Sequence, residues 1–272
     1  MMFQPVLPLG GFAGWSFLNR TLDTQKDAFA QSSEVVRETK YFLENIGKVK
    51  SADDLVSDRT LLKVALGAFG LDDDIGNTYF IRKVLEEGTL SGDSLANKLS
   101  DKRYAELSRT FGFGDYSVPG TALSDFGTRI VSAYQDRQFE IAVGEQNETY
   151  RLAMGIPRDL GKIAGKDQQD DTLWFTVMGT PPLRKVFETV YGLPQSFGAL
   201  DLDKQLQTLK NKTQAVFGDS SIKQFTTPEA QKKLARLFML RTDIQASGAG
   251  AGAGSGEIAL TILQGVTGPL RF

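Results

Sequence analysis

The chain has 272 residues, of which 31 are basic and 33 acidic, and 41% of its residues are hydrophobic. This nearly neutral composition predicts a folded globular protein and excludes bulk binding of nucleic acid through a basic surface. Histidine and cysteine are both absent. The composition therefore also excludes histidine-based triads, thiol nucleophiles, disulfide bonds and histidine or thiolate zinc sites. Carboxylate, lysine or tyrosine chemistry stays open.

The N-terminal segment, residues 1–19, mixes large apolar side chains with prolines and glycines, and its pattern has neither a helical nor a strand period. We therefore predict an extended apolar arm, which either packs onto its own core or docks onto a partner. Its candidate interaction residues are Phe12, Trp15, Phe17 and Leu18. The segment lacks the basic leader of a classical signal peptide, and its interruptions argue against a transmembrane helix.

Residues 20–120 have the spacing of a first helical module. Apolar residues that recur every seven positions predict a long amphipathic helix from Leu22 to Ile46. Glycine stops and polar caps then predict four shorter helices, for the first of which Ser57 or Asp58 is the expected cap. These helices span residues 58–69, 75–87, 91–99 and 101–111.

A second long helix is predicted from Ser124 to Met154, within a connecting segment of residues 121–165. Pro157 is expected to break or restart it, because proline lacks the N–H that a helix interior needs. A second helical module should then occupy residues 166–245.

The C-terminal segment, residues 246–272, begins with a run of alanine, glycine and serine. This composition cannot form a core and is typical of a flexible tether, so both ends of the chain are predicted to be flexible. Beyond the tether lies a short apolar tail, whose candidate interaction residues are Ile258, Leu260, Ile262 and Leu263.

The two predicted modules resemble each other. Residues 61–71 (LLKVALGAFGL) and 183–193 (LRKVFETVYGL) share five identical positions without a gap, and the pattern Leu-x-Arg-x-Phe recurs at 107–111 and 234–238. We interpret residues 166–245 as a repeat of residues 55–111 that buries its matching leucines and aromatics in one shared interior. In the second copy, Thr180 is the expected helix cap.

The densest acidic cluster is formed by Asp72, Asp73 and Asp74. Such oxygen ligands suit calcium or magnesium, so these residues are candidate metal ligands. The alternating spacing and terminal glutamate of a calcium loop are missing, and the dipole of the following helix favours acidic residues there in any case. Glu140, Glu145 and Glu148 are interpreted as an exposed helical face.

Several segments resemble one known family. They are GW-x-FL-x-RT at residues 14–21, the stretch 41–71, RQFEIAVGEQ at 137–146 and GTPPLRKVFETVYGL at 179–193. Together they are similar to the DUF1217 family of alphaproteobacteria, over about residues 14–243. Members of that family are encoded near flagellar genes, so the resemblance implies a link to flagellar assembly or motility. It implies no catalytic residue.

We therefore expect an all-α multi-helix bundle built around a duplicated module, with two long helices. The leading hypothesis is a non-enzymatic structural, export or assembly factor of the flagellum that binds protein partners, uses no cofactor, and is either cytoplasmic or exported with the flagellar apparatus. The alternative is a carboxylate-based hydrolase or a divalent-metal or ligand-binding enzyme, with the turn at Asp72–Asp74 as its focus. The oligomeric state stays open.

Overall fold

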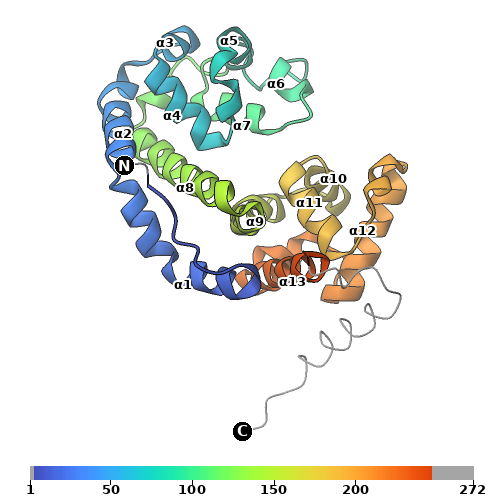
Figure 1. Ribbon diagram of the computed structural model, residues 1–272. Coiled ribbons are helices and arrows are strands. Elements are labelled where there is room, and N and C mark those ends of the chain that lie inside the picture. Colours follow the sequence, from blue (N-terminus) through green and yellow to red (C-terminus); the bar gives the residue numbers. More distant parts are fainter. Residues whose placement is uncertain (1–2, 247–272) are drawn as a thin grey trace.

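The computed structural model describes residues 3–246, and all regular structure in that part of the chain is helical (Figure 1). The predicted all-α class is therefore confirmed, with a multi-helix bundle and no β-strand between residues 3 and 246. The tail candidates Ile258, Leu260, Ile262 and Leu263 lie outside the described residues.

Thirteen α-helices and five short 3₁₀ helices make up the described part of the chain. The α-helices are α1 (Gly11–Ala30), α2 (Ser33–Asn45), α3 (Ala52–Ser57), α4 (Arg59–Phe69), α5 (Thr78–Glu87), α6 (Leu95–Lys98), α7 (Arg103–Phe111), α8 (Phe126–Gln146), α9 (Glu148–Ala164), α10 (Asp170–Met178), α11 (Pro181–Val190), α12 (Leu202–Phe217) and α13 (Pro228–Ala246). The 3₁₀ helices are η1 (Ile46–Lys48), η2 (Asp72–Gly76), η3 (Gly120–Ala122), η4 (Gln195–Ala199) and η5 (Ile222–Thr226).

The described helices enclose two large hydrophobic cores and a small third cluster of Val84, Ala96 and Ala105. The N-terminal core is built by α2 to α5, α7 and the first half of α8, and the C-terminal core by α1, Val35 of α2, the second half of α8 and α9 to α13. Figure 1 shows α8 and α9 running between the helices of the two halves. Helix α8 contributes Tyr134 to the first and Phe139 to the second. The matching Leu61 and Leu183 are both buried, but in different cores, so the expectation of one shared interior is wrong.

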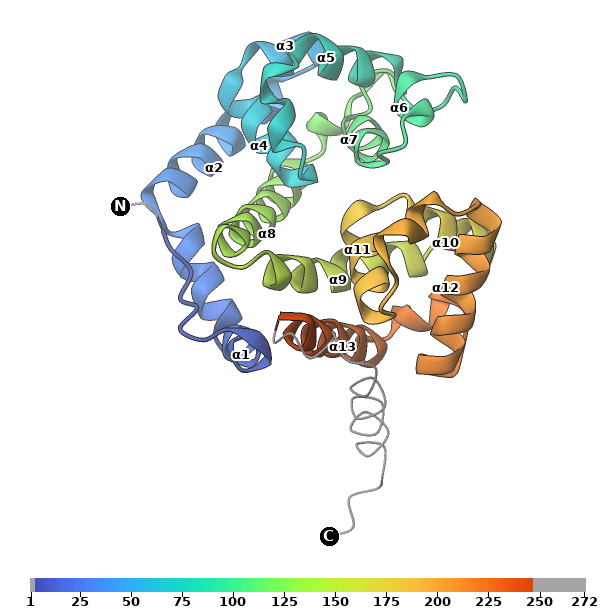
Figure 2. The ribbon, with the colours of Figure 1, turned by 45° about the vertical axis from the view of Figure 1, so that its right-hand side comes forward.

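The predicted extended arm is helical from Gly11 onward. Long-range contacts explain the difference, because the hydroxyl of Tyr150 lies 2.8 Å from the carbonyl oxygen of Gly11 and the backbone N–H of Phe12 donates to Asp243 on α13 at 2.9 Å. Gly14 permits this approach, since a Cβ there would lie 2.0 Å from the carbonyl oxygen of Leu9. Figure 2 shows the result, in which the first helix closes against the last.

Both predicted long helices are interrupted. The first is divided into α1 and α2 at Gln31 and Ser32. The second, in the connecting segment 121–165, is divided into α8 and α9 at Asn147, whose side chain caps α9 by accepting from the N–H of Tyr150 at 3.1 Å. Pro157 lies inside α9 and does not end it. A helix-capping side chain, and not the proline, therefore sets the break.

The paired helices α4 and α11 end in the same backbone geometry. A glycine adopts the left-handed conformation at each end, with φ +70° at Gly70 and +61° at Gly192. The N–H of the next leucine, Leu71 or Leu193, donates to the carbonyl five residues earlier, at 3.0 and 2.9 Å. This is the Schellman arrangement, which glycine favours because it has no Cβ. Duplication of the whole module stays a prediction.

Between residues 3 and 246, no helix combines the length and the apolar composition that crossing a lipid bilayer requires.

Candidate functional site

The acidic turn at Asp72–Asp74 forms η2, directly after α4. Asp72 accepts a hydrogen bond from the side-chain amide of Gln138 on α8 at 2.5 Å, and Asp74 accepts one from the hydroxyl of Tyr104 on α7 at 2.5 Å. Asp73 is exposed. Among the described residues, no three carboxylates converge as metal ligands would. Two of these aspartates therefore connect the end of α4 to α7 and α8.

Burial and the hydrogen bond to Asp74 raise the pKa of Tyr104 to about 12. The hydroxyl consequently stays protonated near neutral pH and remains a donor to the carboxylate. The contact between η2 and α7 is therefore insensitive to pH over the neutral range.

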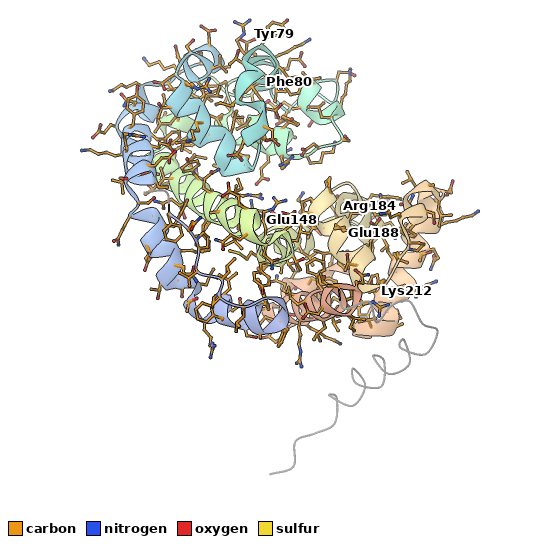
Figure 3. All side chains as sticks on the ribbon, viewed as in Figure 1. Tyr79, Phe80, Glu148, Arg184, Glu188 and Lys212 are labelled. Atoms are coloured by element: carbon orange, nitrogen blue, oxygen red, sulfur yellow. The ribbon has the colours of Figure 1, made fainter. Side chains whose placement is uncertain are left out.

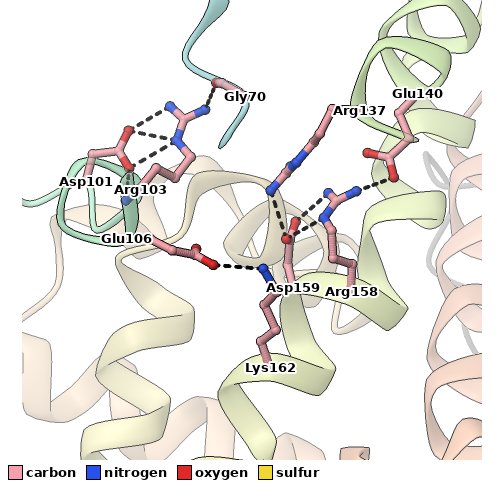
Figure 4. A network of polar contacts seen from close by, with 9 residues as sticks. All are labelled: Gly70, Asp101, Arg103, Glu106, Arg137, Glu140, Arg158, Asp159 and Lys162. Atoms are coloured by element: carbon pink, nitrogen blue, oxygen red, sulfur yellow. Dashed lines mark hydrogen bonds and ion pairs between the residues drawn. The ribbon is translucent and has the colours of Figure 1, made fainter. Parts of the chain in front are cut away.

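A partly buried ionic cluster occupies the junction of α8 and α9 (Figure 4). It consists of Arg137 and Glu140 on α8 and Arg158 and Asp159 on α9. Arg158 forms an ion pair with Glu140 and donates two hydrogen bonds of 2.9 Å to Asp159. Arg137 reaches Asp159 at 3.3 Å. Glu140 is therefore a buried packing residue and not part of an exposed face, which corrects its interpretation from the sequence.

The pKa shifts in the ionic cluster have opposite directions. Burial raises the pKa of Glu140 against the attraction of the two arginines. Burial acts in the same direction on Asp159, but the hydrogen bonds and charge of Arg158, with Arg137, hold the pKa of Asp159 below its ordinary value. Burial lowers the pKa of Arg137 and outweighs the attraction of Asp159 and Glu140. Arg137 also makes fewer hydrogen bonds within the cluster than Arg158.

A cleft of about 640 Å³ lies beside the ionic cluster, between α4, α7, α8 and α9. Phe69 and Ala133 are among its apolar walls, and Arg137 and Arg158 line it from the cluster side. The residues around it include a salt bridge of 2.8 Å between Glu106 on α7 and Lys162 on α9. The cleft therefore joins an apolar surface to a group of cations.

A model of the family described as "Protein of unknown function (DUF1217)" matches residues 68–230, which is more than half of the chain. The chain belongs to this family. The resemblance noted from its sequence is thereby confirmed, whereas the family description itself states no activity.

One solved structure is similar to this DUF1217 protein over most of its length. It is the X-ray crystal structure of protein AGR_C_984 from Agrobacterium tumefaciens, with 29% sequence identity and a TM-score of 0.73. The match covers 89% of this chain and 99% of the other. No curated protein matches the chain. The comparisons therefore establish the family and a similar fold.

The four N-terminal interaction candidates of this DUF1217 protein lie on α1. Trp15 and Leu18 are buried in the C-terminal core. Phe12 is partly buried against the same core, and the guanidinium of Arg236 lies 5.7 Å from the centre of its ring. Phe17 is half-buried. Packing thus accounts for most of the apolar character of this segment.

Three exposed apolar side chains lie instead on two loops of the first module. We call them the loop patch, which consists of Leu90 (71% exposed), Tyr116 (58%) and Val118 (65%). Asp115 ties the two loops together by accepting from the N–H groups of Thr89 at 2.6 Å and Leu90 at 3.0 Å. No periodic pattern predicts this patch, because its residues come from two loops that lie 26 positions apart in the sequence.

Proposed function

We propose that this DUF1217 protein is a non-enzymatic assembly or export factor of the bacterial flagellum that acts through contacts with other proteins. The flagellar part rests on its family, whose members are encoded near flagellar genes. The observation that carries the protein-binding part is the loop patch of Leu90, Tyr116 and Val118.

The apolar side chains of the loop patch are exposed to solvent, and hydrogen bonds hold the backbone that carries them. Asp115 accepts three hydrogen bonds from Thr89 and Leu90, so the two loops keep their relative position without a partner. Burying such an apolar side chain stabilises a complex by about 1.5–3 kcal/mol relative to leaving it exposed. A preorganised surface also avoids much of the entropy cost of ordering loops on binding. Both properties favour a protein-binding role.

The non-enzymatic part of the proposal rests on the contacts that the buried and half-buried carboxylates make. Glu140 and Asp159 are ion-paired across α8 and α9, and Asp72 and Asp74 hold neighbouring helices through hydrogen bonds. Each of these groups thus already has a packing role in the fold.

The test is deletion of the gene in its host bacterium, followed by complementation. Filament number is counted by electron microscopy, and swimming is measured in soft agar. We expect deletion to reduce both, and the unaltered gene to restore them. The triple variant L90S/Y116S/V118S should fold with an unchanged melting temperature but fail to restore swimming, because its apolar contact surface is gone.

The matched control is Leu202→Ser, which alters a side chain of similar exposure (59%) on α12, away from the loop patch. This variant should restore filaments and swimming fully. A deletion strain with normal filaments and normal swimming would refute the flagellar role. A triple variant that complements as well as L202S would refute the role of the loop patch.

A further inference from the structure

The guanidinium of Arg137 has few of the hydrogen bonds that it can make. Its Nε is buried without a partner, and among the described residues its one hydrogen bond is the 3.3 Å contact from Nη2 to Asp159. A buried donor without an acceptor costs about 1–3 kcal/mol, and more for a charged group. Nε itself is enclosed, but the Arg137 side chain lines the cleft and is 19% exposed, so an acceptor in the cleft would use the other donors of its guanidinium.

Two further arginines lie near Arg137, and each has a carboxylate partner: Arg103 pairs with Asp101, and Arg158 with Glu140 and Asp159. Arg103, whose Nη1 donates to the carbonyl oxygen of Gly70, and Arg137 flank the same glycine at the end of α4. Arg158 lies on the other side of Arg137, and Arg137 and Arg158 both contact Asp159 (Figure 4). Burial lowers the pKa of Arg137, while the attraction of Asp159 and Glu140 exceeds the repulsion from Arg158 and Arg103. Arg137 has no carboxylate of its own, however, since its partner Asp159 is shared with Arg158, so an anion is the ligand that would complete its hydrogen bonds.

The cleft wall itself is more cationic than anionic. It includes four cationic side chains and two carboxylates, Glu106 and Asp136. Both carboxylates are already neutralised, Glu106 by Lys162 at 2.8 Å and Asp136 by Lys26 at 2.8 Å. The Glu106–Lys162 pair is well exposed, so it is worth no more than about 1 kcal/mol, and Lys162, which lines the cleft, can turn to a ligand. Arg129, another residue of the wall, forms an ion pair with Asp125, which lies four residues before it in the chain.

We propose that this cleft is a binding site for a small organic anion, whose carboxylate or phosphate group contacts Arg137 and whose apolar part lies against Phe69 and Ala133. Guanidinium groups suit this role because their planar donors match the oxygens of a carboxylate or phosphate. The site is independent of the proposed flagellar function, because it concerns the isolated chain and not a protein partner.

The experiment is an NMR titration of the protein labelled with ¹⁵N-arginine, at constant ionic strength, with inorganic phosphate in one series and benzoate in another. The Nε–Hε signal of Arg137 is assigned by its loss in Arg137→Lys. We expect this signal to shift saturably with at least one probe, while that of the exposed Arg20 shifts weakly and without saturation. Saturation by phosphate alone identifies a phosphate ligand, and saturation by benzoate alone a carboxylate with an apolar body.

Two variants and one control separate binding from folding. R137K keeps the positive charge but loses the fork of donors, so the apparent affinity, read in both proteins from the Nε–Hε signal of Arg158 in the cleft wall, should fall by about tenfold or more, as for the loss of a charged hydrogen bond. Ser132→Trp fills the exposed wall of the cleft and should abolish saturation while the Arg137 signal persists. Arg20→Lys should change nothing. An Arg137 signal that follows Arg20 in every titration of the wild-type protein overturns the proposal.

Discussion

Helices α4 and α11 carry the two similar sequence segments, and they end alike but begin differently. Gly70 and Gly192 both adopt left-handed conformations after the last turn. At the other end, Asp58 caps α4 by accepting from two backbone N–H groups, whereas Thr180 donates its hydroxyl to the carbonyl of Thr176 and caps nothing. The left-handed ending selects glycine, whereas the beginning of a helix tolerates several solutions.

The turns that follow these two helices show the same contrast at the level of tertiary packing. After α4, Asp72 and Asp74 reach α8 and α7 through hydrogen bonds. After α11, the 3₁₀ helix η4 buries Phe197 in the C-terminal core. A similar backbone path is thus held by polar contacts in one half and by an apolar side chain in the other.

The largest predicted effect tests whether the two cores are energetically separate. Leu61→Ala and Leu183→Ala should each destabilise the protein by about 2–5 kcal/mol, because each removes a fully packed leucine. Hydrogen exchange should show that L61A first lowers protection in α3 to α5, and L183A in α10 and α11. Equal loss of protection in both halves for both variants would show one cooperative core.

The next effect concerns the ionic cluster between the cores. Glu140→Gln should destabilise the protein by about 3 kcal/mol, since breaking a buried ion pair leaves the charge of Arg158 less compensated. Glu145→Gln, on the exposed face of the same helix, should change stability by less than about 0.5 kcal/mol. Urea unfolding at neutral pH measures both, and equal midpoints would remove the stabilising role of the cluster.

A smaller effect depends on pH. The pKa of Asp159 is held below its ordinary value, so its contribution to stability is present above the unfolded-state value of about 3.9 and is lost as pH falls through the folded-state pKa. Asp159→Asn should therefore lose less stability than the wild type over this acid range. The measurement is the difference between their unfolding free energies across pH. If the difference between the two unfolding free energies does not change with pH, the lowered pKa of Asp159 is contradicted.

The smallest effects test the difference between the two helix starts. Asp58→Ala should cost about 1 kcal/mol because it removes the cap of α4. Thr180→Ala should cost less than about 0.5 kcal/mol, since its hydroxyl caps no N–H group of α11. Thermal unfolding of the two variants gives the comparison directly, and a larger loss for T180A would reverse it.

Local features of the fold could be predicted from the sequence. The stops of α4 and α5 at Gly70 and Gly88 and the cap at Asp58 need only a few neighbouring residues, and all three are confirmed. The resemblance to DUF1217 could be predicted as well, because it depends on contiguous segments. The arm at residues 1–19 could not, since Tyr150 and Asp243 fix its start from more than 130 positions away.

Most of the candidate site could not be predicted from the sequence. Arg137 and Glu140 are three residues apart on α8, which looks like any helical surface. Their burial depends on the angle at Asn147, which brings Arg158 and Asp159 of α9 against them. One signal was present, since this charged pair lies within the apolar stretch RQFEIAV. The break at Asn147 was not predicted, because Pro157 was expected to interrupt the helix instead.

The closure of α1 against α13 has a consequence for the order in which the protein assembles during synthesis. Every buried residue of the N-terminal core precedes position 135, so that core can form while the ribosome is still adding α9. Trp15 and Leu18, made much earlier, pack in a core that also includes Met239 and must wait for it. Chains arrested before and after α13 should therefore differ in protease cleavage within α1. Until the last helix emerges, the apolar face of the first one is the surface that a chaperone would have to hold.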